Sequence, residues 1–527
     1  LEMKAACNYP PSTFLMSPSW KNLSHEKQSR KSCYTTIRAS STKLANASTK
    51  LANGVASPTH LTDFTLTETR NRNRTQTQTQ IQTGRFGKYG GKYVPELLIS
   101  CLSRLEDEFY KALDDPKFKE ELAEGLRDYV GRETPLYYAE RLTEYYKDIN
   151  ERGPEIYLKR EDLNYGGSHN INNALAQSML AKRMGCTTVV TATGAGQHGV
   201  ATAAACAKVG LQCTVIMGQA DIERRPSAVG LIKLLGAQVK PTEGSFKEAS
   251  SEAIREWVGS LETSYYSPAS VIGPHPCPMM VREFQSVIGK EVRRQAMVKW
   301  GGLPDVLVAC VGCGSNAMGL FHEFRDDEGV RLVGVEAAGC GLWSGRHSAT
   351  LAKGDVGVYQ GTMSYLLQDD EGQIQHAHSI ATGLECPGVG PELSYLKDSK
   401  RAEFYTVTDE EAIDAYKRLC RLEGIFPALE ASHALAYLEK LCPTLPHGTK
   451  VVVNCSGRGD KDASRVLQFN YDGQELEQPN AYDQIGENQY LDVPKKNSRN
   501  GFAHSLPKER ASVRGKGKLS CIDLDLP

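Results

Sequence analysis

The sequence predicts an α/β fold in which parallel strands alternate with helices. Short β-branched runs, such as 189–191 and 306–311, each lead into a glycine-containing turn. A stretch of small and apolar residues long enough for a helix follows each turn. This order recurs along the chain, and such alternation is typical of parallel sheets covered by helices.

The first series of elements begins with the strand at 189–191. A glycine turn at 194–199 and a helix over 201–209 come next. A second strand is expected at 213–217, and a second helix near 229–235.

The second series begins with the apolar strand at 306–311, which leads into a helix over 317–324. Strands at 332–336 and 450–454 follow, and the last of them ends just before a turn at Ser456. Ligands of such sheets bind beyond the carboxyl ends of the strands. The glycine turns lie there, so we expect the ligand site at these turns.

The composition indicates a folded body with polar ends. The chain has 527 residues, of which 40% are hydrophobic and 24% are charged, as is usual for a globular protein. A formal net charge of −1 disfavours a nucleic-acid groove, and no stretch approaches the roughly 20 consecutive apolar residues of a transmembrane helix. The length favours two domains with additional tails.

Fifteen cysteines do not show the spacing of a zinc site. Cys310 and Cys313 form the one CxxC near a recognisable turn, and neither a second pair nor a histidine cluster completes a ligand set. We therefore expect reduced thiols and no metal.

Six strings of residues carry a resemblance to a known family: Leu-Lys-Arg-Glu-Asp-Leu-Asn (158–164), Thr-Gly-Ala-Gly-Gln-His-Gly (193–199), Gly-Pro-His-Pro (273–276), Gly-Ser-Asn (314–316), His-Ala-Leu-Ala (433–436) and Ser-Gly-Arg-Gly-Asp-Lys-Asp (456–462). From about Phe86 to Ser464 the chain resembles the tryptophan synthase β chain. The resemblance implies fold type II of the pyridoxal-phosphate enzymes, with two α/β domains facing each other across the cofactor cleft. The expected parts are an N-terminal segment (86–136) that packs on the cofactor domain, a smaller domain with the communication segment (137–282) and a larger domain with the phosphate loop (283–470).

Two positions of the cleft depart from that family. The β chain has a lysine where this chain has Asn170, and a catalytic carboxylate where it has Ala192. The lysine holds the cofactor as a Schiff base and moves the α-proton; an amide nitrogen cannot, because its lone pair is delocalised. A methyl group cannot shuttle protons. We do not expect the nearby Lys159 or Lys182 to replace the missing amine.

The phosphate loop also differs, because Cys313 stands where the family has a glycine. Backbone N–H groups of such a loop cradle a phosphate, and this side chain is expected to crowd them or to require a backbone angle that favours glycine. We therefore expect no covalently bound cofactor and at most weak noncovalent binding of pyridoxal phosphate. The other loop residues are retained: Gly312, Gly314, Ser315 and Asn316.

Other positions match residues to which the family gives a role. His169 and Glu430 match residues near the phosphate and the ring, and Ser456 matches the hydroxyl facing the pyridine nitrogen. The loop that grips the substrate carboxylate is matched by Thr193, Gly194, Ala195, Gln197 and His198. The positions linked to domain closure and to the α subunit are Arg224, Lys247 and Glu385, the last replacing an aspartate that pairs with the arginine.

Three functions remain open. We favour a noncatalytic β-like protein, a homodimer with one tryptophan synthase α subunit at each end, that promotes release of indole from indole-3-glycerol phosphate for specialised metabolism. The second is an active enzyme that condenses serine and indole into tryptophan, and the third is a ligand-binding sensor. Joint loss of the amine and the carboxylate, with core glycines and prolines kept, favours the first over a trapped or decayed enzyme.

The first 85 residues differ from the body. They are rich in Ser, Thr and Asn, contain four acidic residues, and repeat the string Ser-Thr-Lys-Leu-Ala-Asn. This composition is typical of an organellar transit peptide, and the β-chain-like body favours import into the chloroplast stroma. The segment 471–527 is polar, contains Lys- and Arg-rich strings, and is expected to be a disordered tail.

Overall fold

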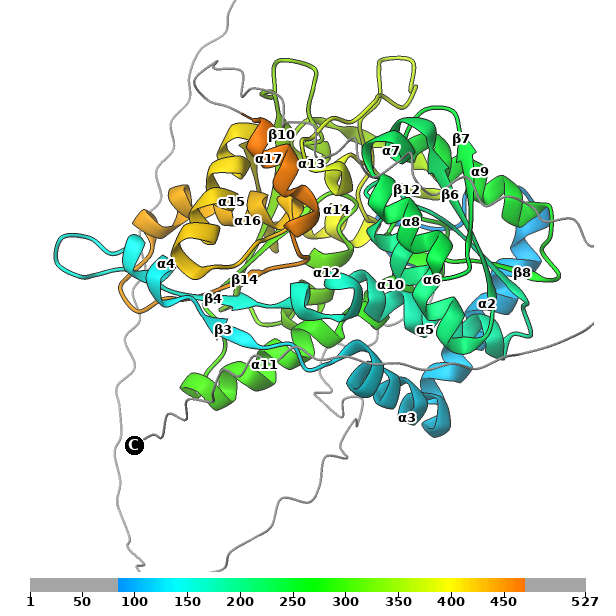
Figure 1. Cartoon of the computed structure of the whole chain (residues 1–527), viewed down its shortest axis with the longest axis horizontal. Helices are drawn as coiled ribbons and strands as arrows, with labels where there is room; N and C mark the ends of the chain where they lie inside the picture. Colours follow the sequence, from blue (N-terminus) through cyan, green and yellow to red (C-terminus); the bar gives the residue numbers. More distant parts are fainter. Residues whose placement is uncertain (1–83, 470–527) are drawn as a thin grey trace, which may run out of the picture. The chain divides into compact units, whose positions relative to one another are not determined.

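The computed structural model describes residues 84–469, and Figure 1 shows their helices and strands. The expected transit peptide, up to residue 83, and the expected C-terminal tail lie outside these residues. Within 84–469 there is no helix with the length and apolar character needed to cross a membrane.

A six-stranded sheet has the strand order β13-β10-β9-β14-β4-β3. Neighbouring strands are parallel, except that β3 runs antiparallel to β4 at one edge. Every residue of β9 is buried, as expected for a continuous apolar run inside a parallel sheet that is covered on both faces. The strands are β3 (Leu136–Tyr138), β4 (Glu155–Lys159), β9 (Val306–Val311), β10 (Arg331–Gly339), β13 (Ala402–Thr408) and β14 (Lys450–Asn454).

Two four-stranded sheets complete the β structure. The first, of order β7-β6-β5-β8, is entirely parallel and consists of β5 (Thr188–Ala192), β6 (Gln212–Gly218), β7 (Gln238–Thr242) and β8 (Ser264–Tyr266). The second, of order β1-β2-β12-β11, is antiparallel and consists of β1 (Arg85–Phe86), β2 (Tyr89–Gly90), β11 (Asp355–Tyr359) and β12 (Thr362–Leu366).

The α-helices lie mainly between successive strands. They are α2 (Leu97–Asp114), α3 (Pro116–Glu124), α4 (Glu140–Tyr145), α5 (Asn170–Arg183), α6 (Gln197–Val209), α7 (Gln219–Arg224), α8 (Pro226–Leu234), α9 (Phe246–Val258), α10 (Cys277–Gln285), α11 (Val287–Trp300), α12 (Ser315–Phe321), α13 (Thr350–Lys353), α14 (Pro391–Asp398), α15 (Asp409–Glu423), α16 (Leu429–Leu441) and α17 (Ala463–Gln468).

The predicted α/β class with parallel sheets is confirmed. The strands expected at 306–311 and 450–454 agree with β9 and β14 at both ends. The helix expected from residue 201 begins earlier, at Gln197, because Gly196 adopts a left-handed angle (φ 87°) and ends the turn there. The segment 137–282, expected as one domain, contributes to two sheets, since β3 and β4 pair within the six-stranded sheet.

A buried network of charges fixes the start of α5. The guanidinium of Arg132 forms ion pairs with Glu161 at 2.8 Å and with Glu291 at 2.7 Å, and donates to Oδ1 of Asn172 on α5 at 2.8 Å. Because buried charges are stable only when they are paired and hydrogen-bonded, this network holds α5 in one position against β4 and α11. It thereby positions the residue that begins α5, Asn170.

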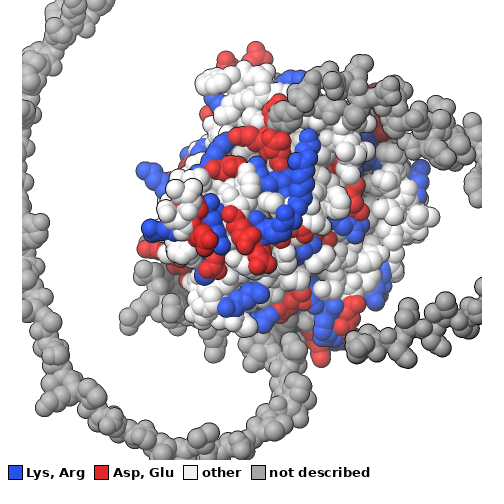
Figure 2. Space-filling view, turned by 60° about the vertical axis from the view of Figure 1, so that its left-hand side comes forward, with Lys and Arg blue, Asp and Glu red and all other residues white. Residues whose placement is uncertain are grey.

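The surface is mixed in charge on the face that Figure 2 presents, where Lys and Arg side chains lie between Asp and Glu.

Candidate functional site

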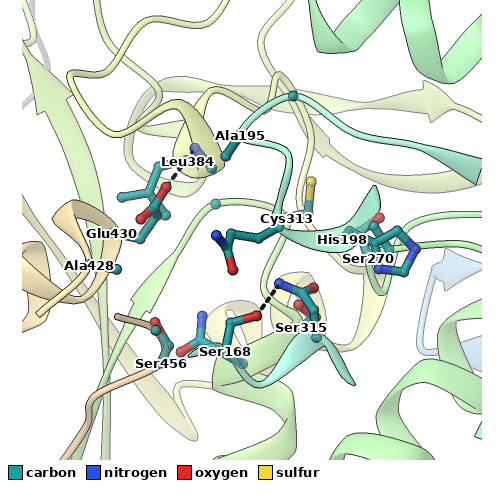
Figure 3. Close-up of a pocket in the computed structure, with 18 of the residues that line it drawn as sticks. Ser168, Ala195, His198, Ser270, Cys313, Ser315, Leu384, Ala428, Glu430 and Ser456 are labelled. Atoms are coloured by element: carbon teal, nitrogen blue, oxygen red, sulfur yellow. Dashed lines mark hydrogen bonds between the residues drawn. The ribbon is translucent and has the colours of Figure 1, made fainter. Parts of the chain in front are cut away.

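A cavity of about 120 Å³ lies at the ends of β5, β9 and β14. Figure 3 shows side chains from several separate segments, among them Cys313, Ser315, Glu430 and Ser456, around one space. The structure brings the predicted cofactor and substrate positions together in its lining: His169, Asn170, Ala192, Thr193, Gly194, Ala195, Gln197, His198, Gly312, Cys313, Gly314, Ser315, Asn316, Glu430 and Ser456. Arg224, Lys247 and Glu385 are not part of this lining.

Sequence reasoning missed part of the lining. The missed residues are Ser168, Phe246, Ala269, Ser270, Cys310, Thr382, Gly383, Leu384, Ala428, Gly457 and Lys461. The string at 456–462 could have indicated Lys461, since Ser456 in the same string was singled out. The segment Thr382–Leu384 carries no motif that would have indicated it.

The two substituted positions face the same cavity. Asn170 is the first residue of α5, and its Nδ2 donates to Oγ of Ser168 at 3.3 Å. Ala192 is the last residue of β5 and is 4% exposed. The cavity wall therefore presents an amide and a methyl group at these two positions, neither of which transfers protons.

The neighbouring lysines do not supply the missing amine. Nζ of Lys159 donates to the Thr134 carbonyl at 2.8 Å and to Glu291 at 2.5 Å, in the buried network and away from the cavity. Nζ of Lys182 donates to the carbonyl of Val209 at 2.8 Å on the surface. Neither Lys159 nor Lys182 lines the cavity, which agrees with the expectation that neither replaces the missing amine.

Lys461 is the one lysine in the cavity lining among the described residues. Its Nζ donates to Asp462 at 2.6 Å and to Glu430 at 3.3 Å. Burial alone would lower the pKa of Lys461, but the two carboxylates outweigh burial and raise this pKa. The amine is therefore held protonated, and a protonated amine is not a nucleophile.

The phosphate loop between β9 and α12 keeps its glycine geometry at Gly314. This residue has φ 103°, and a Cβ there would lie 2.1 Å from Cδ1 of Leu393, so a side chain cannot be accommodated. Cys313 does not have a positive φ. Of the two alternatives expected for Cys313, the backbone angle that favours glycine is therefore wrong, and crowding of the backbone N–H groups stays a prediction.

Cys313 forms a disulfide with Cys386, and the two Cα atoms are 5.8 Å apart. The expectation of reduced thiols is wrong for this pair. The bond joins the phosphate loop to the segment that follows Leu384, across 73 residues of sequence. It was missed because Cys386 belongs to no spacing motif, and only the fold brings the two residues together.

His169 connects the phosphate loop to the end of β14. Its Nδ1 lies 3.0 Å from the carbonyl oxygen of Ser456, which can only accept, so Nδ1 carries the proton. Nε2 then accepts from the hydroxyl of Ser315 at 3.1 Å. Burial lowers the pKa of His169, which keeps the ring neutral and fixes both hydroxyl-bearing residues in place.

Glu430 provides a fixed negative charge in the cavity lining. Its Oε1 accepts from the backbone N–H of Gly383 at 3.0 Å, and its Oε2 accepts from Lys461. Burial alone would raise the pKa of Glu430, but Lys461 and the backbone hydrogen bonds lower it to about 2. The carboxylate is thus ionised across the physiological range.

His198 lines the cavity and carries a buried nitrogen without a hydrogen-bond partner. The side chain is 4% exposed, Nε2 lies 3.3 Å from the carbonyl oxygen of Ser267, and Nδ1 has no partner although it is buried. Because Nε2 donates to that carbonyl, Nδ1 is an acceptor. A buried acceptor without a donor is costly, and a ligand hydrogen-bond donor would satisfy it.

The closure residues form their own contacts. Nη1 of Arg224 lies 3.5 Å from Oε2 of Glu385, so the glutamate makes the pair expected of the aspartate that it replaces. Arg224 also pairs with Asp221 at 2.7 Å. Nζ of Lys247 donates to the carbonyl of Ile374 at 3.1 Å.

The chain matches the family of pyridoxal-phosphate dependent enzymes over residues 128–457, and it belongs to this family. Together with the parallel four-stranded sheet and the mainly parallel six-stranded sheet, this confirms fold type II. The structure is also similar to that of a fungal L-serine ammonia-lyase from Rhizomucor miehei, with 19% identity and a TM-score of 0.49 over 64% of this chain and 96% of the other. A similarity of this extent carries no argument about activity.

The residues of the cavity fit part of the cofactor that the family binds. The loop residues Gly312, Gly314 and Ser315 line the cavity where the family binds a phosphate, and Ser456 and His198 are polar residues in the same lining. When bound, pyridoxal phosphate supplies an aldehyde and an electron-withdrawing ring. The covalent attachment does not fit, because position 170 is an asparagine and Lys461 is held protonated.

Proposed function

We propose that this chain is a noncatalytic relative of the tryptophan synthase β chain that binds the α subunit and promotes release of indole from indole-3-glycerol phosphate. The observation that carries the proposal is the contrast within one cavity. The groups that would hold a ligand are in place, whereas the amine and the carboxylate that would react are replaced by Asn170 and Ala192.

The Arg224–Glu385 pair supports the activating role. In β chains the equivalent pair accompanies closure, and closure is tied to the serine reaction cycle. A chain that cannot run this cycle but forms the pair at 3.5 Å would favour the closed arrangement at all times. Because coupling between binding sites is reciprocal, a partner that prefers the closed arrangement stabilises the active state of the α subunit.

The assembly and the cellular location are part of the same proposal. A homodimer with one α subunit at each end follows from the resemblance to β chains. Location in the plastid stroma rests on the composition of residues 1–85. An active tryptophan synthase remains the competing function, since Lys461 places one amine in the cavity.

The test mixes the full chain with a tryptophan synthase α subunit and measures indole released from indole-3-glycerol phosphate without serine. We expect about a tenfold or greater increase in α turnover, which corresponds to about 1.4 kcal/mol in favour of the active state. Glu385→Gln should reduce this increase because it removes the charge that faces Arg224. Glu371→Gln, which changes an exposed glutamate on a nearby turn, is the matched control.

Each alternative outcome is informative. Association without any increase in indole release would exclude the activating role. Lack of association would favour a ligand-binding sensor. Formation of tryptophan from serine and indole by the chain alone would establish the competing function.

A further inference from the structure

We propose that Cys340, His378 and Asp409 form a zinc-binding site outside the cofactor cavity. One ligand atom from each residue lies within 4.8 Å of the others. The thiolate, the imidazole and the carboxylate are the groups that zinc prefers in proteins. The inference stands independently of the proposed function.

Two of the three distances between the ligand atoms suit a tetrahedral ion. Sγ of Cys340 lies 3.6 Å from Nε2 of His378, and the same nitrogen lies 3.4 Å from Oδ2 of Asp409. Zinc has bonds of about 2.3 Å to sulfur and about 2.0 Å to nitrogen or oxygen, so tetrahedral angles separate its ligands by about 3.3–3.6 Å. The two measured separations therefore agree with two edges of a zinc tetrahedron.

Hydrogen bonds that do not use the ligand atoms hold the three residues in place. The backbone N–H of Cys340 donates to the carbonyl of Arg346 at 3.0 Å, and that of His378 donates to the carbonyl of His347 at 3.0 Å. Oδ1 of Asp409 accepts from the backbone N–H of Ile380 at 2.9 Å, which leaves Oδ2 for the metal. Such supporting contacts orient ligands before a metal binds.

Charge and access also suit a divalent ion. A thiolate and a carboxylate neutralise two positive charges, and Asp409 begins α15, where the helix N-terminus stabilises its negative charge. Cys340 is exposed and His378 is half-buried, so the ion can enter from solvent and a water molecule can complete the four ligands. Sequence spacing could not reveal this set, because its members lie in three segments separated by more than thirty residues each.

The site adjoins the cavity through one segment of chain. His378 is followed by Thr382, Gly383 and Leu384, which line the cavity, and by Cys386, which is bonded to the phosphate loop. Zinc at His378 would fix one end of this segment while the disulfide fixes the other. We therefore expect zinc to reduce opening of residues 378–386.

The test uses the full chain, stripped of metal by a chelator and kept free of thiol reductants, which themselves bind zinc. Competition with a chromophoric chelator measures the zinc affinity of the native chain and of three variants, Cys340→Ser, His378→Gln and Asp409→Asn. Each variant should bind zinc more than about a hundredfold more weakly, since even changes outside the ligand set cost about 10–100-fold. Co²⁺ should give a thiolate-to-metal charge-transfer band and the strong d–d bands of a tetrahedral ion, and both should disappear in Cys340→Ser. Cys420→Ser, which removes a half-buried thiol from α15, is the matched control and should change neither result.

A second measurement separates this site from adventitious binding by other cysteines. Hydrogen exchange at residues 378–386 should slow when zinc is added to the native chain but not when it is added to Cys340→Ser. Equal zinc affinity of the native chain and Cys340→Ser, or cobalt spectra without a thiolate band, would overturn the proposal. Unchanged exchange with specific binding would overturn the predicted effect on the segment.

Discussion

The two sides of the cavity differ in what they retain. On the side of the phosphate loop and β14, His169, Ser315 and Ser456 form a connected hydrogen-bond series, and Glu430 is held ionised by Lys461. On the side of α5 and β5, the two positions that would carry out proton transfer hold an amide and a methyl group.

This difference shows that binding geometry and reactivity depend on separate residues. The retained side is built from backbone turns and buried hydrogen bonds that also stabilise the fold, so changes there would cost folding free energy. Under the proposed function, Asn170 and Ala192 replace side chains that react, and both are neutral residues in the cavity lining. The largest consequences should therefore follow from restoring the reactive side.

Asn170→Lys should give the largest change, because it supplies the amine for a Schiff base. After incubation with pyridoxal phosphate and treatment with borohydride, peptide mapping should find no pyridoxyl-lysine in the cavity of the native chain. The variant should carry about one adduct per chain at position 170. Asn170→Gln, which keeps an amide, is the control. An adduct on Lys461 of the native chain would show that the retained side supplies an amine after all.

Adding Ala192→Glu to Asn170→Lys should give the next largest change. A positioned general acid or base contributes about 10²–10⁴-fold, so tryptophan formation from serine and indole should rise by about a hundredfold or more over the single variant. Ala192→Gln in the same background controls for size and polarity. Equal turnover of the single and double variants would mean that position 192 has no part in the chemistry.

The disulfide allows a test of the stability of the phosphate-loop side of the cavity. In the chain-entropy description, a link across 73 residues contributes about 4 kcal/mol to the free energy of unfolding. Cys313→Ser should therefore lower this free energy by about 2–4 kcal/mol in denaturant titrations under oxidising conditions. Cys420→Ser is the control, since Cys420 is a free thiol. A dithiol reductant should lower the native midpoint and leave that of Cys313→Ser unchanged; a native chain insensitive to the reductant would contradict the disulfide.

The Glu430–Lys461 pair should produce a smaller, pH-dependent effect. The pKa of Glu430 is lowered to about 2 in the folded chain, against about 4.3 when unfolded. A lowered pKa contributes stability that is complete above the unfolded value, so about 3 kcal/mol should be lost as the pH falls from about 4.3 towards 2.

Lys461→Met should flatten that pH dependence, because it removes the charge that keeps Glu430 ionised. Urea titrations between neutral and acidic pH measure the effect. Lys440→Met is the control, because its pair with Glu411 is largely exposed and such pairs contribute about 0–1 kcal/mol. The same slope in Lys461→Met and in the native chain would show that Lys461 does not set the charge of Glu430.

Much of the fold and most of the cavity could be predicted from the sequence. Continuous apolar runs such as 306–311 fix buried parallel strands, and the glycine turns that follow β5 and β9 place the ligand site at their carboxyl ends. The strings at 193–199, 314–316 and 456–462 then identified many of the residues that line the cavity. These features are local in sequence, which is why single-chain patterns reveal them.

The features that escaped prediction join segments far apart in sequence. The Cys313–Cys386 bond, the three residues of the proposed zinc site, and the segment Thr382–Leu384 depend on how loops meet in the folded chain. Sequence spacing does not indicate contacts between segments that are far apart in the chain. The range 137–282 was expected as one domain, although its strand β4 pairs with β14 in the six-stranded sheet.

The central claim is that the chain promotes indole release without consuming indole. The most direct measurement supplies the chain and an α subunit with indole-3-glycerol phosphate, serine and pyridoxal phosphate together, and follows indole and tryptophan in the same reaction. The account predicts that indole accumulates faster than with the α subunit alone, and that tryptophan stays at the uncatalysed level. Tryptophan formed in step with the substrate consumed would contradict it.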